Sequence, residues 1–302
     1  KAFVLTLVGG LSSVVVFVLS MPLLFLVLKD VYTLIEPAMA YILVFFLIFI
    51  LLESDSTKDA LLISVLSGSL GMITLNSSFG QQFILMPVFG GLFAAPSLIY
   101  SLSRDFEIPD QKESFIIELD RIKGGFTGFL AGLLAGTIPG IGAAVSTSFL
   151  TPLMDESSED FITGLGGVNT SDILIAFLAL FLIGSPRTGS SVALQTISEV
   201  RLPDIGFLIG CAIFASGISG IFALKSLDLF LDAIKRFDFN YIGLAALSAI
   251  ILTTFFTTGL YGFIVLLTSS FIGALALLTN CRASCMAVLI VPAIFSFTGS
   301  FI

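Results

Sequence analysis

Residues 132–148 hold the first groups that could bind a ligand. They read GLLAGTIPGIGAAVSTS, with Pro139 between two apolar segments. Because proline lacks a backbone donor and the flanking glycines weaken a helix, the sequence predicts a span split into two half-helices. The amides after the break would form a positive helix N-terminus that attracts a carboxylate or phosphate, and the carbonyls before it could hold a cation.

An ordinary proline kink, packed on a neighbouring helix through small residues, would explain the same stretch. If the stretch is a binding site, five of its residues are the candidate ligands: Pro139, Gly140, Gly142, Ser146 and Thr147.

A second polar group, GLGGVNTSD at residues 164–172, precedes a long apolar run. Its glycines predict another broken backbone, with a helix beginning near Asn169. The Asn169 amide and the Thr170 hydroxyl could bind a carboxylate or a desolvated sodium ion, while Asp172 would orient Asn169 or take part in cation coupling. A capping box is the alternative, in which Asn169 caps the helix and Asp172 accepts from the cap amide.

A third group, GSPRTGSS at residues 184–191, places Arg187 between two apolar segments. An arginine can hold a carboxylate or phosphate with two parallel hydrogen bonds, which makes Arg187 a candidate anion clamp. A side chain that snorkels to the membrane surface is the alternative. For Arg282, next to a predicted helix end, snorkelling is the preferred interpretation.

The elements that must position these residues are membrane helices. The chain is 57% hydrophobic, against roughly 45–50% for soluble domains, which excludes a soluble fold. Its 302 residues allow roughly nine to eleven spanning or half-spanning helices. We therefore predict an all-α, multi-pass protein of the plasma membrane with discontinuous helices. The predicted apolar segments are 2–28, 37–52, 60–75, an interrupted 83–102, 124–154, 161–183, 188–197, 205–231, 241–256, 260–278 and 283–302.

These segments are interpreted as one transmembrane domain, 1–302. Residues 1–102 lead to a loop at 103–123, which its lysines and arginines place in the cytoplasm. Residues 124–198 form the broken-helix region, and 205–302 form regular C-terminal spans. Residues 155–160 carry four acids and no base, which favours the outer side.

Composition also excludes several functions. A net charge of −8 argues against a nucleic-acid partner. The absence of histidine removes the commonest general base and the usual partner of cysteine in zinc sites. The three cysteines are interpreted as packing residues. We expect neither an enzyme nor a bound cofactor or metal, apart from sodium as a coupling ion.

Taken in order, GTIPGIGAA at 136–144, GGVNTSD at 166–172 and LIGSPRTG at 182–189 resemble the large permease (TctA-like) family of tripartite tricarboxylate transporters, in its archaeal branch. The resemblance implies an inverted-repeat architecture of two related halves, each with a proline-glycine broken helix. Only the second such motif is present, so the chain is expected to lack an N-terminal part. GGVNTSD also departs from the motif of the bacterial permeases, which puts citrate-type specificity in doubt.

The leading hypothesis is a secondary transporter for an organic anion such as a di- or tricarboxylate, driven by sodium or protons. One alternative is a translocase for polyprenyl phosphate or another lipid headgroup, and a second is a non-transporting scaffold subunit. The expected partners are the anion, membrane lipid, a small membrane subunit and a second copy in a homodimer.

Overall fold

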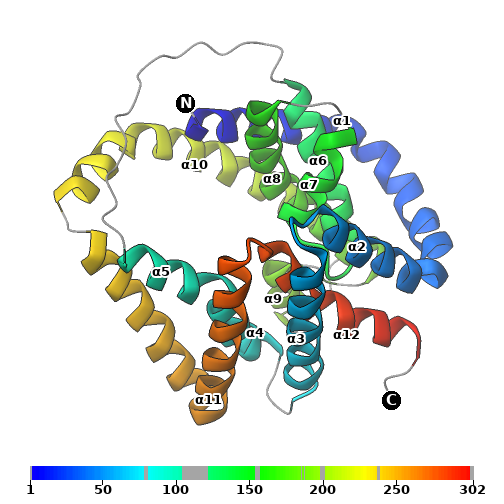
Figure 1. Cartoon of the computed structure of the whole chain (residues 1–302). Coiled ribbons are helices and arrows are strands. Elements are labelled where there is room, and N and C mark those ends of the chain that lie inside the picture. The colour runs from blue at the N-terminus through cyan, green and yellow to red at the C-terminus, as the bar shows by residue number, and fades with distance from the viewer. Residues whose placement is uncertain are drawn as a thin grey trace. The chain divides into compact units, whose positions relative to one another are not determined.

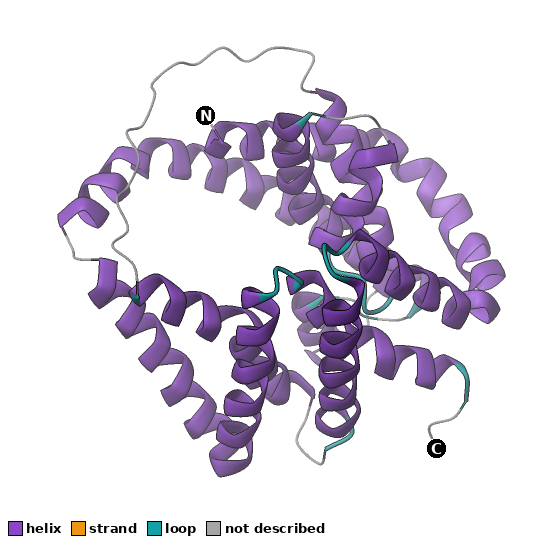
Figure 2. Ribbon diagram, viewed as in Figure 1, coloured by secondary structure: helices purple, strands orange, loops and turns teal. Residues whose placement is uncertain are grey.

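A computed structural model describes residues 2–77, 81–103, 122–153, 157–184, 186, 188–197, 201–236 and 239–299. Every regular element within these ranges is helical, which confirms the predicted all-α class (Figure 2). Among the described residues, six helical segments are long and apolar enough to cross a membrane. They are Ala2–Glu53, Thr57–Leu75, Phe83–Leu102, Ser158–Ile183, Leu202–Leu227 and Asn240–Leu278. The chain is therefore a polytopic membrane protein.

The chain folds into two compact units, each made of two segments that are distant in the sequence. Unit 1 combines Lys1–Met39 with Gln111–Ser226, and unit 2 combines Ala40–Asp110 with Leu227–Ile302. The single transmembrane domain with its linear subdivision stays a prediction. Residues 104–121, most of the predicted cytoplasmic loop, lie outside the described residues.

Unit 1 contains the region in which the candidate ligands lie. Its helices are α1 (Ala2–Ile35), α6 (Ile122–Thr137), α7 (Ala143–Leu153), α8 (Ser158–Ile183), α9 (Gly189–Ile197) and most of α10 (Leu202–Arg236) (Figure 1). The first span is longer than predicted, because α1 continues past Pro22 to Ile35. A short 3-10 helix, Glu36–Ala38, then joins it to α2 (Met39–Glu53).

Glycine backbones hold α1, α6 and α8 together. Four glycines of α6 recur every fourth residue and all face α8, so the two helices touch through their backbones. A Cβ atom added to Gly128 would lie only 2.6 Å from the carbonyl oxygen of Gly164, and one added to Gly9 of α1 would overlap the Thr163 carbonyl. Such small-residue contacts are a usual way for membrane helices to associate. The four glycines are Gly124, Gly128, Gly132 and Gly136.

Two buried serines add hydrogen bonds between these helices. The Ser13 hydroxyl of α1 donates to the Gly167 carbonyl at 3.0 Å, and the Ser171 hydroxyl of α8 lies 3.1 Å from the Gly128 carbonyl. Both serines are fully buried. Interhelical bonds of this kind contribute about 0.6 kcal/mol each on average in membrane proteins. The three helices thus form a close-packed framework on which α7 rests.

Unit 2 is built around an interrupted helix and a kinked one. The predicted irregularity of 83–102 is confirmed: α4 (Gln81–Phe89) passes through a π-helical turn at Gly90–Ala94 into α5 (Ala95–Leu102). The predicted boundary between 241–256 and 260–278 is a kink in α11 (Phe239–Leu278), at Gly259 with φ 62°. The other elements are α2, α3 (Thr57–Leu75), a 3-10 helix at Arg282–Met286 and α12 (Ala287–Phe297).

The interrupted helix of unit 2 packs closely on α11. Gly273 touches the Leu92 backbone, and the buried Ser269 hydroxyl of α11 lies 3.0 Å from the Pro87 carbonyl. Irregular backbone at membrane depth is tolerated where it is buried in protein. The contacts with Gly273 and Ser269 give the irregular turn such cover.

Candidate functional site

Helices α6 and α7 form a hairpin that packs against α8. The glycines of α6 meet residues progressively later along α8, from Asp160 beside Gly124 to Ile175 beside Gly136, so α6 and α8 run in the same direction. Only the five residues 138–142 separate α6 from α7, and Thr147 of α7 lies back beside Gly164. It therefore runs antiparallel to both neighbours.

The tip of this hairpin, residues 138–142, lies short of the end of α8. Gly136, near the end of α6, contacts Ile175, whereas α8 continues to Ile183. Helix α8 is long and apolar enough to cross a membrane, so the tip lies alongside the apolar part of a candidate span. The predicted break is confirmed, because the chain reverses at 138–142 between two separate helices.

The tip exposes the donor end of α7. Gly140 adopts a φ of +78°, which lets the chain reverse. The last α-helical hydrogen bond of α6 runs from the Ile138 amide to the Leu134 carbonyl. The first α-helical hydrogen bond of α7 runs from the Ser146 amide to the Gly142 carbonyl. The amides of 143–145 therefore precede the first bond of α7 and have no helical acceptor. Such amides, with the helix dipole, attract an anion.

The two candidate hydroxyls of α7 are fully buried beside the tip. Ser146 lies 3.1 Å from the Gly142 carbonyl, and Thr147 donates to the Ala143 carbonyl at 2.8 Å. Because each hydroxyl hydrogen is used within α7, the oxygens present lone pairs outward. Hydroxyl oxygens in that state suit a cation or an N–H donor better than an anion. Pro139, Gly140 and Gly142 are half-buried.

The predicted helix break at Asn169 is wrong. Helix α8 runs unbroken from Ser158 to Ile183, and its capping box is formed by Ser157 and Asp160 rather than by Asn169 and Asp172. The Asp160 carboxylate accepts the Ser157 amide at 3.1 Å. Glycine weakens an isolated helix, but a Cβ atom on Gly166 would lie 2.1 Å from the Thr6 carbonyl. Close packing on α1 therefore compensates for the low helical propensity of this stretch.

The polar residues of α8 point to different neighbours. Thr170 packs against Gly10 of α1, away from the hairpin, and Asn169 is exposed. Asp172 follows Val168 by four residues and so shares its face of the helix. Val168 packs in one apolar cluster with Ala135 and Ala143, which flank the tip.

Asp172 is therefore the ionisable side chain of α8 on the face that packs near the tip. It is half-buried, and among the described residues we find no hydrogen bond or ion pair to its carboxylate. An ionisable side chain in a membrane span is costly, and it usually marks a pathway for substrate or ions. The structure thus brings together two features that were predicted from separate motifs: the helix break at Pro139 and Gly140, and the carboxylate of Asp172.

Arg187 and Ser185 lie outside the described residues, so the anion clamp stays a prediction. The neighbouring residues form the start of α9. The Thr188 amide donates to the Ser191 hydroxyl at 2.9 Å, and the Ser191 amide lies 3.3 Å from the Thr188 hydroxyl oxygen. This reciprocal pair caps α9 directly after the segment that carries Arg187.

The hairpin bears on the predicted sides of two loops. Gly124, near the start of α6, is in contact with Asp160, near the start of α8. The two helix starts therefore lie at the same end of unit 1, so the predictions of a cytoplasmic 103–123 and an outer 155–160 are incompatible. The lysines and arginines of 103–123 carry more weight than the acids of 155–160, because acidic residues contribute little to membrane orientation.

Gly140→Ala tests the geometry of the tip. We expect a several-fold loss of ligand binding with a stability loss of about 1–2 kcal/mol, because an alanine at positive φ is strained and pushes the tip out of shape. Calorimetry with the ligand and a thermal melt measure the two effects. Gly299→Ala, at φ 68° with open space around it, should show the strain without the binding loss. Equal binding by both variants would contradict the assignment.

Comparison with known proteins assigns the sequence to a family. The chain is 28% identical over 296 residues to an uncharacterized protein of Methanocaldococcus jannaschii, an archaeon, and the match covers 96% of this chain and 74% of that protein. No solved structure is significantly similar to it. The family profile described as "Tripartite tricarboxylate transporter TctA family" matches residues 1–288, which include the hairpin, α8 and all six candidate spans. The chain therefore belongs to the tripartite tricarboxylate transporter TctA family and is a multi-pass protein of the plasma membrane.

Proposed function

We propose that the chain is the translocating subunit of a secondary active transporter for an organic anion such as a di- or tricarboxylate, coupled to sodium or protons. Membership of a family of transporters supports the class of function. Transport leaves its substrate chemically unchanged, so no catalytic residue is required. A homodimer and a small membrane subunit, as the word tripartite implies, belong to the same proposal.

One observation carries the proposal: the half-buried Asp172, in a helix long and apolar enough to cross a membrane, lies on the face of α8 that packs near the donor end of α7. The amides of 143–145 would hold a substrate carboxylate. Asp172 repels that carboxylate unless a positive charge lies between them or Asp172 is protonated. A sodium ion shared by Asp172 and the substrate, or a proton on Asp172, removes the repulsion. Substrate and cation would then bind more tightly together than apart, which is the thermodynamic requirement for coupling.

The remaining candidates would complete the site around this pair. Ser146 and Thr147 offer oxygen lone pairs to the cation, and Arg187 would neutralise a second carboxylate of the substrate. Asn169 would hydrogen-bond the substrate from the exposed face of α8, one turn before Asp172 and Ile173. Thr170 faces α1, so we expect it to act only after a rearrangement of that contact.

The first test is the thermal stability of the full chain in detergent with di- and tricarboxylates and polyprenyl phosphates, each with and without sodium. A specific ligand stabilises a protein by mass action, by about 2.7 kcal/mol at 100 times its Kd. Stabilisation by a carboxylate that grows with sodium, or with falling pH, would support the proposal. Stabilisation by lipid phosphates alone would favour the translocase, and no stabilisation by any of these compounds would favour a scaffold.

Asn169→Ala tests the α8 side of the site. Uptake of the stabilising anion into proteoliposomes should fall at least about tenfold, the usual effect of removing a charge-assisted hydrogen bond. The melting temperature should not change, because Asn169 is exposed and, within the described part of the chain, makes no side-chain hydrogen bond. Gln195→Ala, an exposed amide of α9, serves as the control. Full uptake by Asn169→Ala would remove Asn169 from the site.

A further inference from the structure

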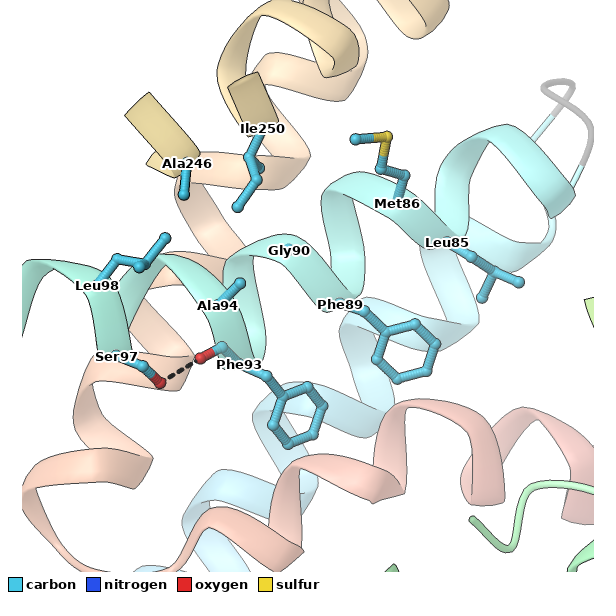
Figure 3. Close-up of a pocket in the computed structure, with 10 residues that line it drawn as sticks. All are labelled: Leu85, Met86, Phe89, Gly90, Phe93, Ala94, Ser97, Leu98, Ala246 and Ile250. Carbon is cyan, nitrogen blue, oxygen red and sulfur yellow. Dashed lines mark hydrogen bonds between the residues drawn. The ribbon is translucent and has the colours of Figure 1, made fainter. Parts of the chain in front are cut away.

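An apolar groove runs along the interrupted helix of unit 2 (Figure 3). It has a volume of about 810 Å³ and is widely open to its surroundings. The lining residues form two adjacent rows along α4, the π-turn and α5, together with two residues of α11. The lining residues are Leu85, Met86, Phe89, Gly90, Phe93, Ala94, Ser97, Leu98, Ala246 and Ile250.

The groove has the dimensions of a lipid tail. Ile250 of α11 packs close over Gly90, where an added Cβ atom would lie 3.1 Å from its Cγ2 atom, and the phenyl rings of Phe89 and Phe93 lie on the other side of the helix (Figure 3). From Leu85 to Leu98 the helix rises roughly 20 Å. One leaflet of a bilayer core is about 15 Å thick, so the groove is long enough to hold an acyl chain lying along the helix.

Both walls belong to segments that cross the membrane. The interrupted helix is part of the candidate span Phe83–Leu102, and Ala246 and Ile250 belong to Asn240–Leu278. An open apolar groove between two spans is in contact with lipid tails wherever no protein covers it. The open side of the groove therefore lets a lipid tail enter. The groups at the ends of the groove determine which lipid headgroup is preferred.

One end of the groove carries a positive charge. Ser97 donates its hydroxyl to the Phe93 carbonyl at 2.5 Å, and its oxygen accepts a hydrogen bond from Nη2 of Arg282. Arg282 is exposed, and its guanidinium has five donors, of which this contact uses one. The nearby Asp55 carboxylate accepts a hydrogen bond from the Asn280 amide at 2.6 Å. Among the described residues we find no ion pair to Arg282.

We propose that this groove binds one acyl chain of an anionic phospholipid, with the headgroup phosphate paired to Arg282. The bound Ser97 fixes the guanidinium at the end of the groove, and its free donors can form two parallel bonds with a phosphate. A neutral, zwitterionic lipid would fill the groove equally well but would gain less at Arg282. Selectivity thus comes from charge at one end and binding from the apolar lining. The proposal is independent of the transported substrate.

The absence of tryptophan from the sequence allows a direct test. Leu98→Trp places a single fluorophore on the groove beside Ser97, and Phe256→Trp places one at an exposed position of α11 outside the groove. The full chain is reconstituted in phosphatidylcholine bilayers with increasing fractions of brominated phosphatidylglycerol or brominated phosphatidylcholine. Bromine on a tail quenches the fluorophore only when that tail is adjacent.

For Leu98→Trp, brominated phosphatidylglycerol should reach half of its maximal quenching at an about fivefold lower fraction than brominated phosphatidylcholine, the usual effect of one arginine near an anionic headgroup. Phe256→Trp should be quenched equally by both. Adding Arg282→Gln to Leu98→Trp should abolish the preference, whereas Arg282→Lys should keep most of it. Thermal melts identify any variant that has lost its fold.

Two results would overturn the proposal. Equal quenching of Leu98→Trp by both lipids, or a preference that survives Arg282→Gln, would show that Arg282 does not select the lipid. Absence of quenching at Leu98→Trp, with normal quenching at Phe256→Trp, would show that a protein segment covers the groove.

Discussion

Asp172→Asn is expected to reduce coupled uptake roughly 100-fold, near the upper range of coupling between two ligands, while leaving the protein folded. The carboxylate is half-buried on the face of α8 that packs near the hairpin tip, and among the described residues it has no partner whose loss would destabilise the fold. Asparagine has nearly the same shape but can neither carry a proton nor neutralise a sodium ion. A neutral amide also costs less than a charge in a membrane span, so the melting temperature should stay equal or rise.

The measurement is uptake into proteoliposomes with and without a cation gradient, together with thermal melts in detergent. Asp172→Asn should also remove the effect of the cation on substrate affinity. Glu53→Gln changes the net charge by the same amount at an exposed position of α2 and should transport normally. Retention of cation-dependent uptake by Asp172→Asn would place coupling elsewhere in the protein.

Gly128→Ala is expected to lower the melting temperature by roughly 4–8 °C. The added Cβ would lie 2.6 Å from the Gly164 carbonyl oxygen and 2.7 Å from the Gly167 Cα atom. These are backbone atoms, so no side chain can rotate away, and α6 and α8 must separate. Overpacking costs about 1–3 kcal/mol, which exceeds the gain of up to about 1 kcal/mol from replacing glycine by alanine in a helix. A loss near 2 kcal/mol corresponds to that shift.

Gly210→Ala is the matched control for this substitution. Gly210 lies in α10 with open space where the Cβ would be, so the higher helical propensity of alanine should leave the melting temperature equal or slightly higher. A stable Gly128→Ala variant would mean that α6 and α8 are not in backbone contact.

The helix break in α6–α7 could be predicted from sequence because its causes are local. Proline lacks a donor and Gly140 adopts a positive φ, and both act within a few residues. The interruption at Gly90–Ala94 and the kink at Gly259 are signalled by local proline and glycine in the same way. Local chemistry alone therefore fixes most of the irregular points of this fold.

The continuity of α8 could not be predicted in that way. Gly166 and Gly167 have the composition of a broken helix, yet their role is to let α1 and α6 approach. That role depends on partners more than a hundred residues away in α1. The four-residue spacing of Gly124, Gly128, Gly132 and Gly136 did contain a signal for close packing, but it does not identify the partner helix. The contribution of Ser13 to the same interface left no local signal.

The packing of the α6–α7 hairpin has a consequence for how the chain is made. The four glycines of α6 form a row of bare backbone that packs against α8, and α8 follows both hairpin helices in the sequence. A glycine-rich helix is weak by itself, so α6 gains this support only after residues 158–183 have been synthesised. The order of the helices along the chain therefore delays the final packing of the hairpin until α8 is present.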